Sequence, residues 1–94
     1  MTSIYVIHMP PSDLGLDKCG HGPEVGSKAI YGFLKRTQPR LSLHGHIHES
    51  PEISGKWFGQ IGETLCIQPG QLEPFTYVVI DLELMSFERK TDPR

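Results

Sequence analysis

The chain has 94 residues, of which 37% are apolar and 21% charged, and its formal net charge is -2. This length predicts one small domain over residues 1–94, and the composition is that of a globular protein rather than a disordered chain. The lack of a basic surplus argues against nucleic acid as a structural partner. No apolar run approaches the roughly 20 residues of a membrane span, so we expect no membrane partner.

The N-terminus and the two cysteines predict a cytoplasmic protein. The first residues have no basic region and soon reach two prolines, so they do not resemble a signal peptide. Cys19 and Cys66 are far apart and form no Cys-x-x-Cys motif. We therefore expect free thiols in a reducing cytoplasm.

The first segment with a clear pattern predicts a buried strand over residues 3–8. This β-branched and aromatic run stops at Pro10 and Pro11, where two backbone donors are lost and the chain must leave the sheet. Residues 9–26, which are rich in glycine and proline, predict a long loop. Loops of this length in small domains are usually functional or disordered.

Residues 27–38 predict a helix. Ser27 is a suitable N-cap and Pro39 stops the helix. Gly32 in the helix interior costs about 1 kcal/mol, which suggests close packing at that position. The apolar side chains expected to share one face are Ala29, Ile30, Phe33 and Leu34.

A second short strand is predicted over residues 41–44. A helix of about three turns between two strands is typical of a βαβ unit, so we expect these strands to be parallel. The rest of the chain is β-rich and predicts antiparallel strands in a meander, with a frayed tail over 91–94. The expected strands are 56–61, 64–68, 75–84 and 86–90. The predicted fold class is therefore α/β, a βαβ unit followed by antiparallel strands.

The histidines are the residues that indicate chemistry. His44, His46 and His48 alternate directly after the second strand, and His8 ends the first. The carboxyl ends of neighbouring parallel strands meet at one edge of a sheet, where open α/β folds place their ligand sites. Neutral imidazole is a common ligand of zinc, iron, nickel and copper. We expect Gly45 to let the backbone turn sharply and direct His46 and His48 inward.

A structural interpretation of these residues stands beside the functional one. A single histidine at a strand end is more often a satisfied core or surface residue, and an alternating histidine run can be a solvated turn. We interpret His21, in the glycine-rich loop, as a residue with no role in the site. The placement of His46 and His48 after Gly45, with His8 on an adjacent strand, favours a site.

The segment LSLHGHIHESP over residues 41–51 resembles the GHxH signature of calcineurin-like metallophosphoesterases. IHMPP over residues 7–11 resembles the preceding block of that family, in which a histidine ends a strand before a proline pair. The segments over 26–29 and 62–71 are similar to the spacing of small members of the family. The resemblance covers roughly residues 3–84.

This resemblance implies a four-layer α/β/β/α sandwich, of which the chain would form half, and a site with two divalent metals that hydrolyses phosphoesters. The metals would be manganese, iron, zinc, nickel or cobalt. His8 and His46 match histidines on the second metal, and His48 matches a ligand of the first. Paired metals would clamp the phosphate and activate a water for in-line attack.

The departures from the family concern its N-terminal blocks. The sequence contains no Asp-x-His, no Gly-Asp and no asparagine, so the DxH, GDxxD and GNH blocks are absent. The histidine of the GNH block that assists the leaving group is therefore missing, and we assign no catalytic residue. We expect weak metal binding and little or no hydrolysis from the chain alone.

Three functions remain open at this stage. The chain is a metallophosphoesterase-family half-domain, a metal-binding or oligomerising module without hydrolase activity, or a structural remnant. The missing half would leave a sheet edge and an apolar face uncovered. We therefore expect either a homodimer or a partner that supplies the N-terminal half.

Overall fold

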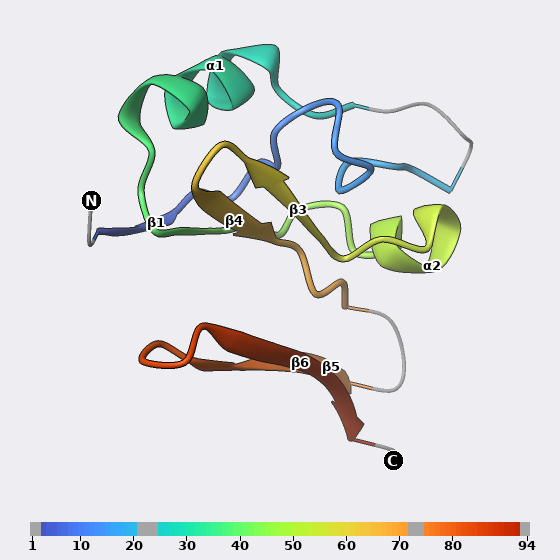
Figure 1. The fold of residues 1–94 in the computed structure, drawn as a ribbon. Coiled ribbons are helices and arrows are strands. Elements are labelled where there is room, and N and C mark those ends of the chain that lie inside the picture. The colour runs from blue at the N-terminus through green and yellow to red at the C-terminus, as the bar shows by residue number, and fades with distance from the viewer. Residues whose placement is uncertain (1–2, 21–24, 72–74, 93–94) are drawn as a thin grey trace.

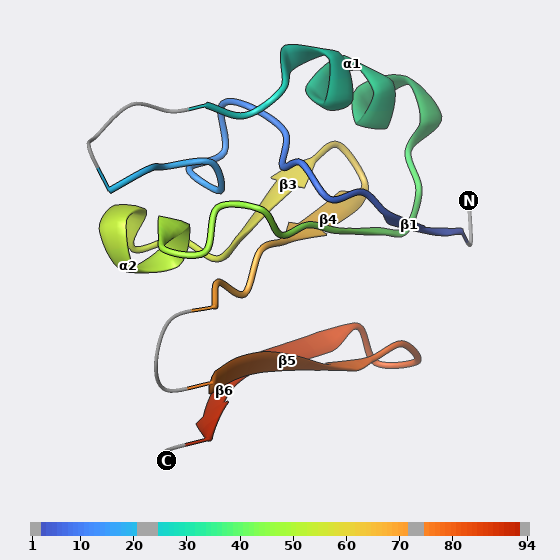
Figure 2. The same ribbon diagram turned by 180° about the vertical axis from the view of Figure 1, so that it is seen from behind.

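The computed structural model describes residues 3–20, 25–71 and 75–92, and their helices and strands form a small mixed α/β fold (Figure 1). One helix covers a four-stranded sheet, and a separate β-hairpin lies on the other side of that sheet (Figures 1 and 2). In chain order the elements are β1 (Ile4–Val6), α1 (Lys28–Thr37), β2 (Leu41–Leu43), α2 (Ser50–Ser54), β3 (Phe58–Ile61), β4 (Thr64–Ile67), β5 (Phe75–Asp81) and β6 (Ser86–Asp92).

The predicted βαβ unit is confirmed. β1 pairs with β2 in parallel, with Val6 opposite Leu43. Helix α1 connects them, and the Ser27 hydroxyl accepts a hydrogen bond from the Ile30 N–H at 3.0 Å, as expected of an N-cap. The two strands therefore end side by side at the same edge of the sheet.

The expected meander is only partly correct. The antiparallel pairs β3–β4 and β5–β6 are present, but β4 lies between β2 and β3 and runs parallel to β2. All four residues of β4 are buried, as in a central strand covered on both faces. The chain then leaves this sheet at Pro69 and Gly70, and Gly70 has a φ of 81°. The hairpin consequently forms a second sheet.

Two apolar clusters lie on opposite faces of the four-stranded sheet. The cluster under α1 is built around Leu16, Leu34, Ile61 and Cys66. The cluster under the hairpin is built around Leu41, Leu65 and Ile67, and the hairpin adds Val78, Ile80 and Phe87 to it. The described residues thus make three layers, a helix, a sheet and a hairpin.

The two sides of the gap between the sheets differ. At the β3 and β6 side, the rings of Trp57, Phe58 and Phe87 contact one another at centroid distances of 4.9 to 5.7 Å. At the β1 and β5 side, Val6 is 78% exposed although it lies on the face that carries the second cluster. The sandwich is therefore closed by aromatic side chains on one side and open on the other.

Three local expectations are corrected. The core-facing stripe of α1 consists of Ile30, Tyr31 and Leu34, while Phe33 is 39% exposed and stacks on Tyr5 at the margin of the helix. Gly32 is not closely packed, because a Cβ there would meet only the Arg36 guanidinium, at 3.4 Å. Residues 91 and 92 belong to β6 rather than to a frayed tail, and residues 93–94 lie outside the described part.

Among the described residues, no helix is long and apolar enough to cross a membrane.

Candidate metal site

His8 and His46 form a pair at the carboxyl edge of the parallel strands. His8 follows β1 and His46 follows β2, and their rings meet edge to face with centroids 5.0 Å apart. The Nδ1 atom of His46 lies 3.1 Å from the Nε2 atom of His8. Both side chains are exposed, so the pair can be reached by an ion from solvent.

The turn that presents His46 differs from the expected one. His46 itself has a φ of 67°, in the left-handed region that non-glycine residues rarely adopt. A Cβ at Gly45 would lie 3.7 Å from the His8 ring, which is ordinary contact. The sharp turn therefore lies at His46, and such backbone strain costs about 1–3 kcal/mol that surrounding contacts must offset.

His44, which was not predicted as a site residue, is buried next to the backbone around His8 and is 6% exposed. Its Nδ1 atom lies 3.0 Å from the carbonyl oxygen of Ile7 and 3.1 Å from that of Met9, and its Nε2 atom lies 2.8 Å from the Ser42 hydroxyl. Burial lowers the pKa of His44, while its hydrogen bonds to the Met9 and Ile7 carbonyls act in the opposite direction. The position of His44 at the end of an apolar run was the only sequence signal of burial.

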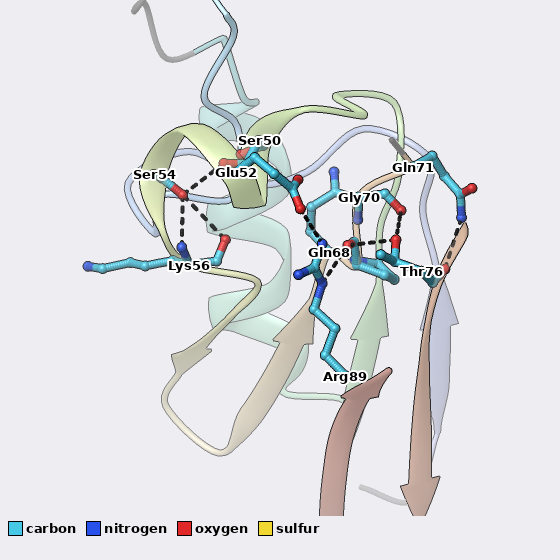
Figure 3. Close-up of polar contacts among 10 residues, drawn as sticks. Ser50, Glu52, Ser54, Lys56, Gln68, Gly70, Gln71, Thr76 and Arg89 are labelled. Atoms are coloured by element: carbon cyan, nitrogen blue, oxygen red, sulfur yellow. Dashed lines mark hydrogen bonds and ion pairs between the residues drawn. The ribbon is translucent and has the colours of Figure 1, made fainter. Parts of the chain in front are cut away.

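The segment after β4 holds the loop of residues 44–48 through hydrogen bonds. The buried amide of Gln68 donates from Nε2 to the Gly45 carbonyl, and the Gln71 N–H donates to the His48 carbonyl at 2.9 Å. The same segment contacts the hairpin, because the Thr76 hydroxyl donates to the Gly70 carbonyl at 3.0 Å (Figure 3). Arg89 of β6 then pairs with Glu52 of α2 at 2.7 Å (Figure 3). The loop is thereby tied to both sheets.

His48 is exposed and forms no metal-binding group with the pair among the described residues. Within residues 3–20, 25–71 and 75–92, no three His, Cys, Asp or Glu side chains are grouped so that they could hold a metal ion. The structure thus brings together two of the three predicted ligands, and metal binding by the set stays a prediction. His21 lies outside the described residues.

Cys19 and Cys66 are both free thiols, as expected. Cys66 lies in the core opposite Ser42 on the neighbouring strand. Burial raises the pKa of its thiol, against a smaller opposing effect of its hydrogen bond with Ser42. A buried thiol with a raised pKa is a poor metal ligand and nucleophile. Neither cysteine contributes to the histidine pair.

An apolar cavity adjoins the pair on the open side of the sandwich. It has a volume of about 620 Å³ and runs from His8 and Gly45 along the edges of both sheets. Its apolar lining includes Val6, Leu43, Ile67, Tyr77, Val78 and Ile80. The candidate metal site therefore lies at one end of an uncovered apolar surface.

The fold is similar to two solved structures. One crystal structure matches with a TM-score of 0.76 at 21% identity, over 94% of this chain and 32% of that chain. The crystal structure of TT1561 of Thermus thermophilus matches with a TM-score of 0.66 at 23% identity, over 96% of this chain and 34% of that chain. This chain thus spans about a third of the length of each, and likeness at this level of identity shows the fold alone. No protein-family model matches the sequence, and no curated protein matches it.

Proposed function

We propose that this chain is the C-terminal half of a calcineurin-like metallophosphoesterase domain and that His8 and His46 bind a divalent transition metal. The observation that carries this proposal is the 3.1 Å separation of His46 Nδ1 from His8 Nε2. The likeness to parts of solved structures about three times as long supports a chain that forms only part of a larger domain. In this proposal the complete domain is a four-layer α/β/β/α sandwich.

The geometry of the pair fits a shared ion. Histidine nitrogens bind zinc at about 2.0–2.1 Å, so two of them at octahedral or tetrahedral angles lie about 2.8–3.4 Å apart. The observed separation falls within this range. The chemistry of the donors also fits, since two neutral imidazoles suit zinc, iron, nickel or cobalt better than calcium or magnesium.

The proposed activity needs more ligands than the described pair offers. A bound divalent metal would supply Lewis-acid polarisation of a phosphate oxygen and a lowered pKa for bound water. His8 and His46 would hold it, with His48 as a ligand of a second ion. The remaining ligands, which the family draws from its DxH, GDxxD and GNH blocks, would come from the N-terminal half of the domain.

The open side of the sandwich supports such a partner. β1 is an edge strand of the four-stranded sheet, and the adjacent cavity is lined by apolar residues of β1 and β5. Unpaired strand edges beside an apolar surface favour strand addition. We propose that the N-terminal half of the domain covers this side and supplies those ligands. A second copy of this chain, which lacks the same blocks, would cover the surface without completing the site. The same surface favours a second candidate function, a metal-binding or oligomerising module without hydrolase activity.

Calorimetric titration of the chain with Zn²⁺ and Mn²⁺ tests the metal site. We expect weak binding that is lost in His8→Ala and in His46→Ala and is retained in His21→Ala, the matched histidine control. Binding should also weaken as the pH falls, because protons compete with the metal for imidazole nitrogen. Equal binding by His8→Ala and the unmodified chain would refute the site.

A further inference from the structure

The side chain of His44 contacts the backbone on both sides of His8. Its Nδ1 atom lies within hydrogen-bond distance of the carbonyls of Ile7 and Met9, which precede and follow His8. A carbonyl oxygen can only accept, so Nδ1 carries the proton and donates to both. The Nε2 atom is then left to accept from the Ser42 hydroxyl, at 2.8 Å. Both ring nitrogens are thus occupied within the core, and His44 cannot itself be a ligand in this arrangement.

These contacts add to the backbone hydrogen bonds where β1 ends. The Ile7 N–H donates to the Leu43 carbonyl at 3.0 Å, and the Gly45 N–H donates to the His8 carbonyl at 2.9 Å. Beyond Met9 the chain continues with Pro10 and Pro11, which have no N–H to offer to a neighbouring strand. The imidazole of His44 therefore supplies a further donor at this point, to the carbonyls of residues 7 and 9.

His8 depends on this arrangement because its own ring is exposed and meets the His46 ring edge to face. An exposed side chain on a free loop would sample several positions, whereas a ring on a backbone held at both neighbours has few. Displacement of His8 by about 1 Å would move its nitrogen out of the range for a shared ion.

We propose that His44 is a positioning residue that sets the distance between His8 and His46 by holding the two carbonyls around His8. This inference rests on the proposed metal site for its purpose, but the positioning can be tested without metal. The alternative is a core histidine that contributes only to stability.

Two polar substitutions separate positioning from a contribution to stability alone, because each places a polar group near only one of the two ring nitrogens. His44→Asn places an amide N–H near the position of Nδ1 and keeps a donor for the Ile7 and Met9 carbonyls. His44→Gln places its amide near the position of Nε2 and keeps only the Ser42 contact. Ser42→Ala is the matched control, since it removes the Nε2 partner and leaves both carbonyl bonds in place.

The first readout is the nitrogen–nitrogen scalar coupling between His8 Nε2 and His46 Nδ1 in the metal-free, ¹⁵N-histidine-labelled chain. We expect this coupling in the unmodified chain, in His44→Asn and in Ser42→Ala, and its loss in folded His44→Gln. The second readout is calorimetric Zn²⁺ affinity, which we expect to fall about 10–100-fold in His44→Gln and to be largely retained in His44→Asn.

Loss of the coupling in folded His44→Asn or in Ser42→Ala, or its absence from the unmodified chain, would overturn the inference even if His44→Gln does not fold. Equal coupling in His44→Asn and His44→Gln would also overturn it. If the coupling follows the expected pattern but no variant binds Zn²⁺, the positioning role stands and the proposed metal site fails.

Discussion

His8 and His46 are 38 positions apart in the sequence, yet His46 Nδ1 lies 3.1 Å from His8 Nε2. The parallel register of β1 and β2 accounts for this meeting, because Val6 is opposite Leu43 and each strand ends just before its histidine. The topology brings the residues to one edge, and the backbone contacts of residues 7–9 and 44–45 bring the rings together.

The chain alone should not hydrolyse a nitrophenyl phosphodiester when manganese is added. The proposed reaction needs two metals, whereas the described residues contain no group of three candidate ligands. Release of nitrophenol by the purified chain and by its His48→Ala variant is the measurement. Turnover by the chain that His48→Ala abolishes would contradict the prediction.

The chain should self-associate or require a partner through its open side. Light scattering at micromolar concentration should report at least twice the chain mass of 10.6 kDa. Val6→Lys should lower the measured mass, because a charge at the exposed β1 edge opposes strand addition. Gln60→Lys, at an exposed position of β3 on the closed side, is the control and should leave the mass unchanged.

A soluble monomer that unfolds cooperatively on heating would contradict self-association. Association that Gln60→Lys and Val6→Lys reduce equally would place the contact elsewhere.

Acid should destabilise the chain through His44. The folded pKa of this residue is lowered from its ordinary value of 6.5 by burial. Below pH 6.5 the unfolded chain therefore binds more protons at this position than the folded chain, and the free energy of unfolding falls as the pH drops. The slope attributable to one such proton is at most about 1.4 kcal/mol for each pH unit.

Denaturant unfolding of the unmodified chain and of His44→Asn between about pH 7.5 and 5 measures this effect. The stability of the unmodified chain should fall relative to that of the variant below about pH 6.5, because only the unmodified chain has the buried His44 imidazole. Parallel curves would show that His44 does not contribute.

Two glycines should respond in opposite ways to alanine. Gly32→Ala should raise the free energy of unfolding by about 0.5–1 kcal/mol, because the site lies in a helix and has room for a methyl group. Gly62→Ala should lower it by about 1–3 kcal/mol, because Gly62 has a φ of 59° and its Cβ would lie 2.5 Å from the Gln38 Oε1 atom. Thermal unfolding of both variants is the measurement, and an unchanged Gly62→Ala would contradict the steric argument.

Much of the first half could be predicted from local patterns. The N-cap at Ser27 and the stop at Pro39 are chemical properties of single residues, and they placed α1 to within one residue at each end. Helix α2 was not predicted, because five residues carry no periodic pattern. It is tied instead to the distant loop, through Ser50 Oγ and the Lys18 N–H at 2.9 Å, and Ser54 Oγ and the Gly15 carbonyl at 2.7 Å.

The sequence by itself determined that His8 and His46 follow neighbouring parallel strands, because a helix of three turns between two short strands leaves few other connections. Only the tertiary structure decided the order of the strands, the separate hairpin and the role of His44. Strand order depends on which faces are buried by residues distant in sequence, and β4 became central because both its faces are covered. His44 has its role because the carbonyls it holds belong to the loop after β1, 35 and 37 positions away in the chain.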